Sequence, residues 1–253
     1  MIQDLEDQVR RAADACFGVG AGARITGGFN NVRGDWLEQI LAVIFANLTA
    51  TGEYGNTVIA RLPNTGTMPY QELFGPTARA YLTDLYDSLE EHHISMTMSN
   101  PDFVCVTNLS DEVFAAIRGP FTLKVTDIET LWDAYKSIQG RCDPFHIPFV
   151  LTVKTSVRPD RRYQIVHEAN IVKALAAHLA SRYWKRDLYI PFYALIAGPV
   201  SDSDRKVLRN PVTHTLVQVS WDPAPVVDSV YSIDSIAEVQ TIISNLLAPL
   251  RVR

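Results

Sequence analysis

Apolar and polar positions follow two periods along the chain, one typical of helices and one typical of strands. Helical spacing of apolar residues predicts helices over residues 3–15, 35–50, 76–93, 127–139, 161–184, 201–208 and 233–247. Short apolar, β-branched runs predict strands over 94–98, 103–107, 147–156, 188–197 and 215–220. Because strands alternate with helices over much of the chain, we expect an α/β fold with a mixed central β-sheet flanked by helices.

The same pattern bears on domain organisation. The 253 residues contain no internal repeat, low-complexity tract or clear linker, so we expect a single domain over 1–253 with a helical N-terminal subregion of about 1–93. Apolar residues make up 47% and charged residues 20%, which is typical of a globular chain with a core and excludes a disordered or collagen-like protein.

Several features favour a soluble cytoplasmic protein without a membrane partner. The longest apolar run, Ile40–Leu48, is too short to span a bilayer, and the acidic N-terminus does not resemble a secretory signal. The three cysteines are scattered and odd in number, which fits a reducing compartment better than a disulfide framework.

Charge is unevenly distributed. The whole chain has a net charge of −5, but residues 154–186 contain eight basic and two acidic side chains, so this segment carries +6 and the remainder −11. One basic segment in an acidic protein predicts a local anion-binding surface. A solvated helix face is the alternative interpretation.

A lysine lies within the most apolar predicted strand. In Phe149–Ser156 the side chains of Thr152, Lys154 and Ser156 share one face. An ammonium group there is costly unless it has a partner or a function, although an edge strand with a solvated face would also accommodate it.

A basic cluster follows this strand at the start of the predicted helix. Pro159 suits a first helical position, and Arg158, Asp160 and Arg161 surround it. Arginine forks match the O6 and N7 atoms of guanine, and aspartate can accept from the cytosine amino group. This group therefore has the chemistry to read G·C pairs, although an exposed ion-paired helix cap has the same composition.

Three acidic residues are candidates for a site near the lysine. Glu168 lies nearly two helical turns after Arg161, Asp102 precedes an apolar strand, and Glu38 has a largely apolar helix face around it. Ordinary alternatives exist for each: a surface glutamate, a turn aspartate, and a capping box formed by Asp35 and Glu38. Two carboxylates and an ammonium could together hold Mg²⁺ and stabilise a phosphodiester during hydrolysis.

These residues resemble a known family in their order and spacing. Pro101-Asp102, Lys154-x-Ser156-x-Arg158-x-Asp160-Arg161 and Glu168 resemble the type II restriction endonucleases that cut around a CCGG core, the NgoMIV/SgrAI-like group of the PD-(D/E)xK nucleases. Most of that superfamily has an acid two residues before the lysine. Here Thr152 takes that position, and the acid comes from the following helix, as in the CCGG group.

The resemblance implies a restriction-endonuclease-like core and a role for each residue. Asp102 and Glu168 would bind Mg²⁺, Lys154 would be the catalytic lysine, and Glu38 would match a further catalytic acid from the N-terminal helices. The group Arg158, Asp160 and Arg161 would read C·G pairs in the major groove.

The resemblance also implies an enzymatic activity, an oligomeric state and a cellular location. We expect cleavage of double-stranded DNA at a palindromic site with 5′ CCGG overhangs, by a homodimer or homotetramer in a prokaryotic cytoplasm. Two other functions remain open at this point. One is a non-catalytic, sequence-specific DNA-binding protein, and the other is a small-molecule enzyme that uses the glycine-rich stretch Gly18–Gly28.

Overall fold

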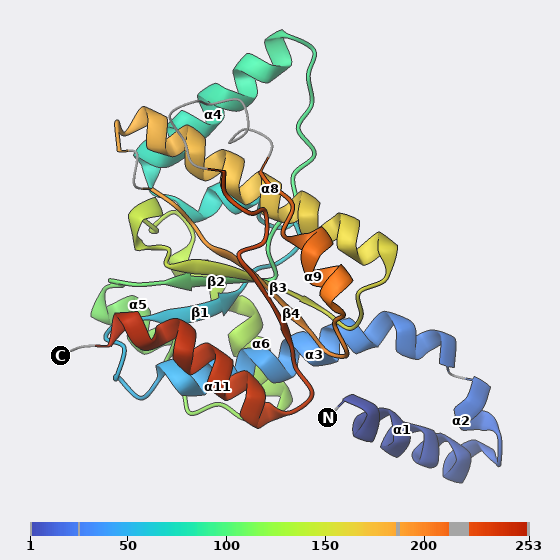
Figure 1. Cartoon of the computed structure of the whole chain (residues 1–253). Helices are drawn as coiled ribbons and strands as arrows, with labels where there is room; N and C mark the ends of the chain where they lie inside the picture. The colour runs from blue at the N-terminus through green and yellow to red at the C-terminus, as the bar shows by residue number, and fades with distance from the viewer. Residues whose placement is uncertain (1, 25, 186–187, 213–222, 252–253) are drawn as a thin grey trace.

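The chain forms a mixed β-sheet with helices on both faces (Figure 1), as the sequence predicts. The structure is a computed structural model and describes residues 2–24, 26–185, 188–212 and 223–251. The strands are β1 (Val58–Arg61), β2 (Phe103–Val106), β3 (Phe149–Lys154), β4 (Phe192–Ile196) and β5 (Ser229–Ser232). The α-helices are α1 (Ile2–Phe17), α2 (Ala21–Arg24), α3 (Thr26–Thr49), α4 (Pro76–Glu91), α5 (Asp111–Ile117), α6 (Val125–Asp133), α7 (Tyr135–Ile138), α8 (Pro159–Arg182), α9 (Asp202–Leu208) and α11 (Ile236–Leu247). Short 3-10 helices cover Tyr70–Leu73, Pro144–His146 and Ala248–Leu250.

The strands follow one another across the sheet in chain order, β1-β2-β3-β4-β5. β1, β2 and β3 pair antiparallel, whereas β3, β4 and β5 pair parallel. The parallel pair β3 and β4 requires a crossover connection, which the long helix α8 supplies. The start of β2 and the end of β3 therefore lie together at one edge of the sheet, because these two strands run in opposite directions.

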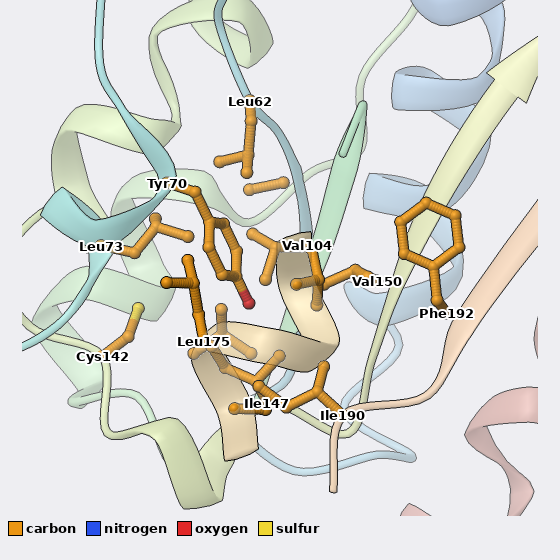
Figure 2. Packing of buried hydrophobic residues seen from close by; sticks show 14 of the residues in the cluster. Leu62, Tyr70, Leu73, Val104, Cys142, Ile147, Val150, Leu175, Ile190 and Phe192 are labelled. Atoms are coloured by element: carbon orange, nitrogen blue, oxygen red, sulfur yellow. The ribbon is translucent and has the colours of Figure 1, made fainter. Parts of the chain in front are cut away.

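The sheet divides the core into two clusters. Helices α4 and α8 cover one face, and α3 and α11 cover the other (Figure 1). Successive residues of β3 point to opposite faces, so Val150 belongs to the same cluster as Val172 on the α8 side, and Leu151 belongs to the same cluster as Leu41 on the α3 side. Figure 2 shows part of the α8-side cluster.

Local sequence explains where the later helices begin. Pro159 occupies the first turn of α8, where its missing N–H costs no helical hydrogen bond. Ser201 is the N-cap of α9, and Ser235 is the N-cap of α11. In each capping box the serine hydroxyl accepts from the backbone N–H of the third helical residue, Asp204 or Glu238. The carboxylate of that residue accepts from the backbone N–H of the serine.

The glycine-rich stretch is not a phosphate-binding loop between a strand and a helix. Gly18 and Gly20 have φ values of 93° and 89° and form the turn between α1 and α2. Residues 27 and 28 lie inside α3, which begins at Thr26 rather than at the predicted residue 35. The extra turns carry α3 away from the sheet toward α1, where Arg33 forms an ion pair with the buried Glu6.

Two predicted strands differ from the structure. Residues 94–98 have no regular secondary structure and run along the α4 and α8 pair instead. Met96 and Met98 pack against the core there, and the Thr97 carbonyl lies 3.1 Å from Nε2 of His167. The alternating apolar residues of 94–98 therefore reflect packing against helices and not pairing with a strand. The predicted strand over 215–220 lies outside the described residues.

Several boundaries also move, and some short elements were not predicted. The predicted helix 127–139 is two helices, α6 and α7, separated at Ala134. The strands β1 and β5 have four residues each and helix α5 has seven, which is too short for a clear periodic pattern. β1 lies within the N-terminal stretch to residue 93 and pairs with β2.

Candidate active site

The central candidate residues meet at the edge of the sheet where β2 begins and β3 ends. Phe103 pairs with Leu151, so Asp102 lies beside the last residues of β3. The Asp102 carboxylate accepts from the backbone N–H of Val153, with Oδ2 2.6 Å from the nitrogen. This contact directs the carboxylate toward the end of β3. It follows from the antiparallel register, which places Asp102 beside the last residues of β3.

Lys154 lies between two acids and is 8% exposed. Its Nζ is 3.1 Å from Oδ2 of Asp102 and 3.5 Å from Oε1 of Glu168. Burial alone would lower the pKa of the ammonium, but the nearby Asp102 and Glu168 charges outweigh burial, so the pKa is raised. The lysine is therefore a buried cation, not the solvated side chain of an edge strand.

Glu168 reaches this edge from α8, which packs on the same face of the sheet as Thr152. The Thr152 hydroxyl lies 2.7 Å from Oε2 of Glu168 and 3.0 Å from Oδ2 of Asp102. Burial raises the pKa of Glu168, with a further increase from Asp102, against the opposing effects of Lys154 and Thr152. This glutamate is 1% exposed, which excludes the interpretation as an ordinary surface residue.

Glu38 approaches from the other face of the sheet, on α3. Its Oε2 accepts from Nε of Arg61 at 2.7 Å, and burial together with the Asp102 charge raises the pKa of Glu38 to about 7. Lys154 lowers this pKa, so Glu38 lies within electrostatic reach of the Asp102–Lys154–Glu168 cluster. The sheet edge thus receives acids from helices on both of its faces.

The predicted base-reading residues form a separate, exposed group at the start of α8. Arg158 is the residue before the helix, and its Nη2 is 3.6 Å from Oδ2 of Asp160. Nε of Arg161 is 3.7 Å from the same oxygen, and its Nη1 donates to Gln164. These three residues follow Lys154 by four to seven positions in the chain, and their side chains are exposed to solvent.

The buried cluster has the donor set that a magnesium ion prefers. Among the described residues no three His, Cys, Asp or Glu side chains gather as a ready metal site, so the ligands on offer are the two carboxylates of Asp102 and Glu168. Both lie within hydrogen-bonding distance of the Thr152 hydroxyl, and Mg²⁺ is commonly held by one or two carboxylates with water completing its shell. The residues present therefore fit this ion.

Arg61 belongs to the surroundings of the site and was not identified from the sequence. It ends a four-residue strand, and its guanidinium carbon lies 4.5 Å from the centre of the Trp132 ring. An arginine after an apolar run gives no signal of its own, because its partner Glu38 is distant in the chain. Thr152 carried a signal, since it occupies the position of the usual acid, but its bridging contact did not follow from the sequence.

The mixed sheet, and the acids and lysine at its edge, define the class of protein as a nuclease of the restriction endonuclease type. The family model described as Cfr10I/Bse634I restriction endonuclease matches residues 1–249, and the chain belongs to this family. The Type II restriction enzyme Cfr10I of Citrobacter freundii is 28% identical over 227 residues, which are 88% of this chain and 79% of the relative.

Solved structures agree with this assignment. The Type IIF restriction endonuclease Bse634I with cognate DNA matches with a TM-score of 0.86 and 29% identity over 97% of this chain and 84% of that chain. A second structure, Bse634I restriction endonuclease, matches with the same score and identity and 86% of its own chain covered. The chain is thus a site-specific deoxyribonuclease by family. In the part of the chain that the structure describes, no helix is long and apolar enough to cross a membrane.

Proposed function

We propose that this chain hydrolyses double-stranded DNA in a Mg²⁺-dependent reaction at a palindromic site with a CCGG core, leaving 5′ CCGG overhangs. The observation that carries the proposal is the convergence of Asp102, Lys154 and Glu168 at one sheet edge. Membership of a type II restriction endonuclease family supports sequence-specific cleavage. The metal, the core sequence and the overhang rest on the donor set and on the resemblance at residues 154–168.

In this reaction the side chains at the sheet edge have different tasks. Asp102 and Glu168 would hold the ion, and the Thr152 hydroxyl orients their carboxylates. When held by these two acids, the ion would supply positive charge to the phosphate and a more acidic water. Lys154 donates from Nζ to the phosphate oxygens, where negative charge increases during the reaction. Glu38 adds a further acid from the opposite face of the sheet.

Recognition would come from the exposed group at the start of α8. Arg158 and Arg161 present guanidinium groups that can bind guanine edges, and Asp160 can accept from the cytosine amino group. Asp160 lies between the two arginines, so the three side chains support one another's orientation in the free protein. A palindromic site has two equivalent halves, and a homodimer or homotetramer would supply two such helix ends.

Plasmid digestion tests the catalytic assignment. Wild type is expected to linearise a plasmid with a CCGG-containing site when Mg²⁺ is present and to lose activity with EDTA. Lys154→Ala is expected to lose cleavage, because no other ammonium group contacts both acids among the described residues. Lys136→Ala removes an exposed lysine that pairs with Asp133 and is the matched control. Cleavage by Lys154→Ala at the wild-type rate would contradict the assignment.

Two further measurements test specificity and assembly. Arg158→Ala is expected to weaken binding to CCGG-containing DNA by about 1–3 kcal/mol relative to scrambled DNA, as one lost bidentate base contact does. Arg251→Ala, at an exposed arginine that pairs with Glu53, is the control. Sequencing the cut ends identifies the site and the overhang, and sedimentation with cognate DNA measures the assembly; a protein that cuts as a monomer would contradict the two-fold model.

A further inference from the structure

Arg61 lies directly beside the start of β2, next to a proposed metal ligand. In the antiparallel pair β1 and β2 it is opposite Phe103, the residue after Asp102. The next residue, Leu62, donates its backbone N–H to the Asp102 carbonyl at 2.9 Å. The backbone around Arg61 therefore has a fixed position relative to the buried cluster, set by the sheet register.

The side chain of Arg61 is held on two sides. Nε donates to Oε2 of Glu38 at 2.7 Å, and the guanidinium lies over the ring of Trp132 on α6. The side chains of Arg61 and Glu38 are only 15% and 16% exposed. A pair that is largely removed from water is more sensitive to loss of one partner than a surface pair is, because the remaining charge stays buried.

Arg61 stabilises the negative charge of Glu38, which burial and the neighbouring Asp102 carboxylate destabilise. Burial and the Asp102 carboxylate both disfavour the ionised form of Glu38, whereas Arg61 and Lys154 favour it. The Lys154 ammonium is already within 3.5 Å of both Asp102 and Glu168. Arg61 is the cation that donates a hydrogen bond to Glu38.

We propose that Arg61, held in place by Trp132, is a positioning residue for the endonuclease reaction that fixes the Glu38 carboxylate at the edge of the Asp102–Lys154–Glu168 cluster. This proposal rests on the proposed function, in which Glu38 is a catalytic acid. The competing interpretation is an ion pair that joins α3 to β1 and contributes only to stability.

Arg61→Gln and Arg61→Lys distinguish the two interpretations. We expect Arg61→Gln to lower kcat about tenfold or more while the Kd for cognate DNA in EDTA changes less than about threefold, because the effect is on the reaction and not on binding. Arg61→Lys keeps a cation beside Glu38 and is expected to recover part of kcat. Equal losses of kcat in both variants, or a loss confined to DNA binding, would overturn the proposal.

A double-mutant cycle with Glu38→Gln makes the test specific. In the Glu38→Gln background, Arg61→Gln is expected to cause no further loss of kcat, since the group that it positions is already absent. The same loss of kcat in both backgrounds would show that Arg61 acts independently of Glu38 and would overturn the proposal. Arg251→Gln is the matched control, because Arg251 also pairs through Nε with a glutamate, Glu53, and lies near an aromatic ring.

Trp132→Leu covers the case in which Arg61→Gln does not fold, as judged by circular dichroism. It removes the ring that holds the guanidinium but keeps the ion pair, and we expect a severalfold lower kcat; an unchanged kcat would overturn the proposal. Lys154→Ala separates this inference from the proposed function. If Lys154→Ala is inactive while Arg61→Gln retains wild-type kcat, only the role of Arg61 fails, whereas an active Lys154→Ala contradicts the proposed function itself.

Discussion

Thr152 and Glu168 are joined by a 2.7 Å contact between the threonine hydroxyl and Oε2 of the glutamate. The same hydroxyl lies 3.0 Å from Oδ2 of Asp102. A hydroxyl has a single proton and can donate it to one acceptor at a time. Its position between Oδ2 of Asp102 and Oε2 of Glu168 links the acid that precedes β2 to the acid carried by α8.

Replacing Thr152 tests this bridge. Thr152→Val keeps the shape of the side chain but removes the hydroxyl from Oε2 of the buried Glu168, so we expect a loss of about 1.5–3 kcal/mol in the free energy of unfolding. Cleavage should fall as well, because the two carboxylates lose their common orientation. Thr152→Ser retains the hydroxyl and should stay close to wild type in cleavage. Urea unfolding and plasmid cleavage measure both effects, and a fully active Thr152→Val would contradict the bridging role.

Glu38 predicts a pH dependence of stability in the absence of metal. Its pKa is raised to about 7 from an ordinary 4.5, so the folded state binds more protons than the unfolded state between these values. The stability from protonated Glu38 is therefore complete below pH 4.5 and is lost as pH rises through 7. Glu38→Gln lacks this loss, so between pH 4.5 and 8 the free energy of unfolding of the variant should rise relative to that of wild type by about 3 kcal/mol.

Urea unfolding of both proteins in EDTA at several pH values measures this difference. Loss of the Arg61 contact in Glu38→Gln adds an offset, so the slope of the difference with pH is the informative quantity. A difference that stays constant across this range would contradict the shifted pKa of Glu38.

A second buried ion pair predicts unequal effects of its two partners. Lys173 on α8 is 3% exposed in its side chain and donates to Asp228 at 2.8 Å, whereas Asp228 also accepts from the backbone N–H of Phe192 and from the Tyr189 hydroxyl. Asp228→Asn leaves a buried ammonium without its counter-charge and should cost about 3–5 kcal/mol. Lys173→Met leaves the aspartate with two donors and should cost less. The opposite order in urea unfolding would contradict this account.

Replacing the buried Tyr70 with phenylalanine is expected to stabilise the protein. Figure 2 shows the tyrosine ring among apolar side chains that include Leu73, Val104 and Leu175. The hydroxyl is buried and has no hydrogen-bond partner within the described part of the chain. Removing an unpaired buried hydroxyl removes a desolvation cost, so Tyr70→Phe should raise the free energy of unfolding by about 1 kcal/mol. A lower melting temperature for Tyr70→Phe would show that the hydroxyl does have a stabilising partner.

Much of the secondary structure could be predicted from the sequence, and so could the candidate residues Asp102, Lys154 and Glu168 that the fold brings together. Strong periodicity located α4, α8, α11 and the strand β3 to within a few residues, because a helix or strand that buries one face must repeat apolar residues at its own period. The spacing of residues from Lys154 to Glu168 indicated that they belong to one candidate site, because they lie on β3 and on α8, which follows it directly in the chain.

Contacts between distant segments were decided only by the tertiary structure. The sequence gives no sign that Arg61 pairs with Glu38, or that Thr152 lies against both Asp102 and Glu168, because each contact depends on sheet register and helix packing. Short strands such as β1 exist because β2 offers a pairing edge, and residues 94–98 lack a strand because they pack on helices. Side-chain identity thus determined which chemistry is available, and packing determined which groups share one site.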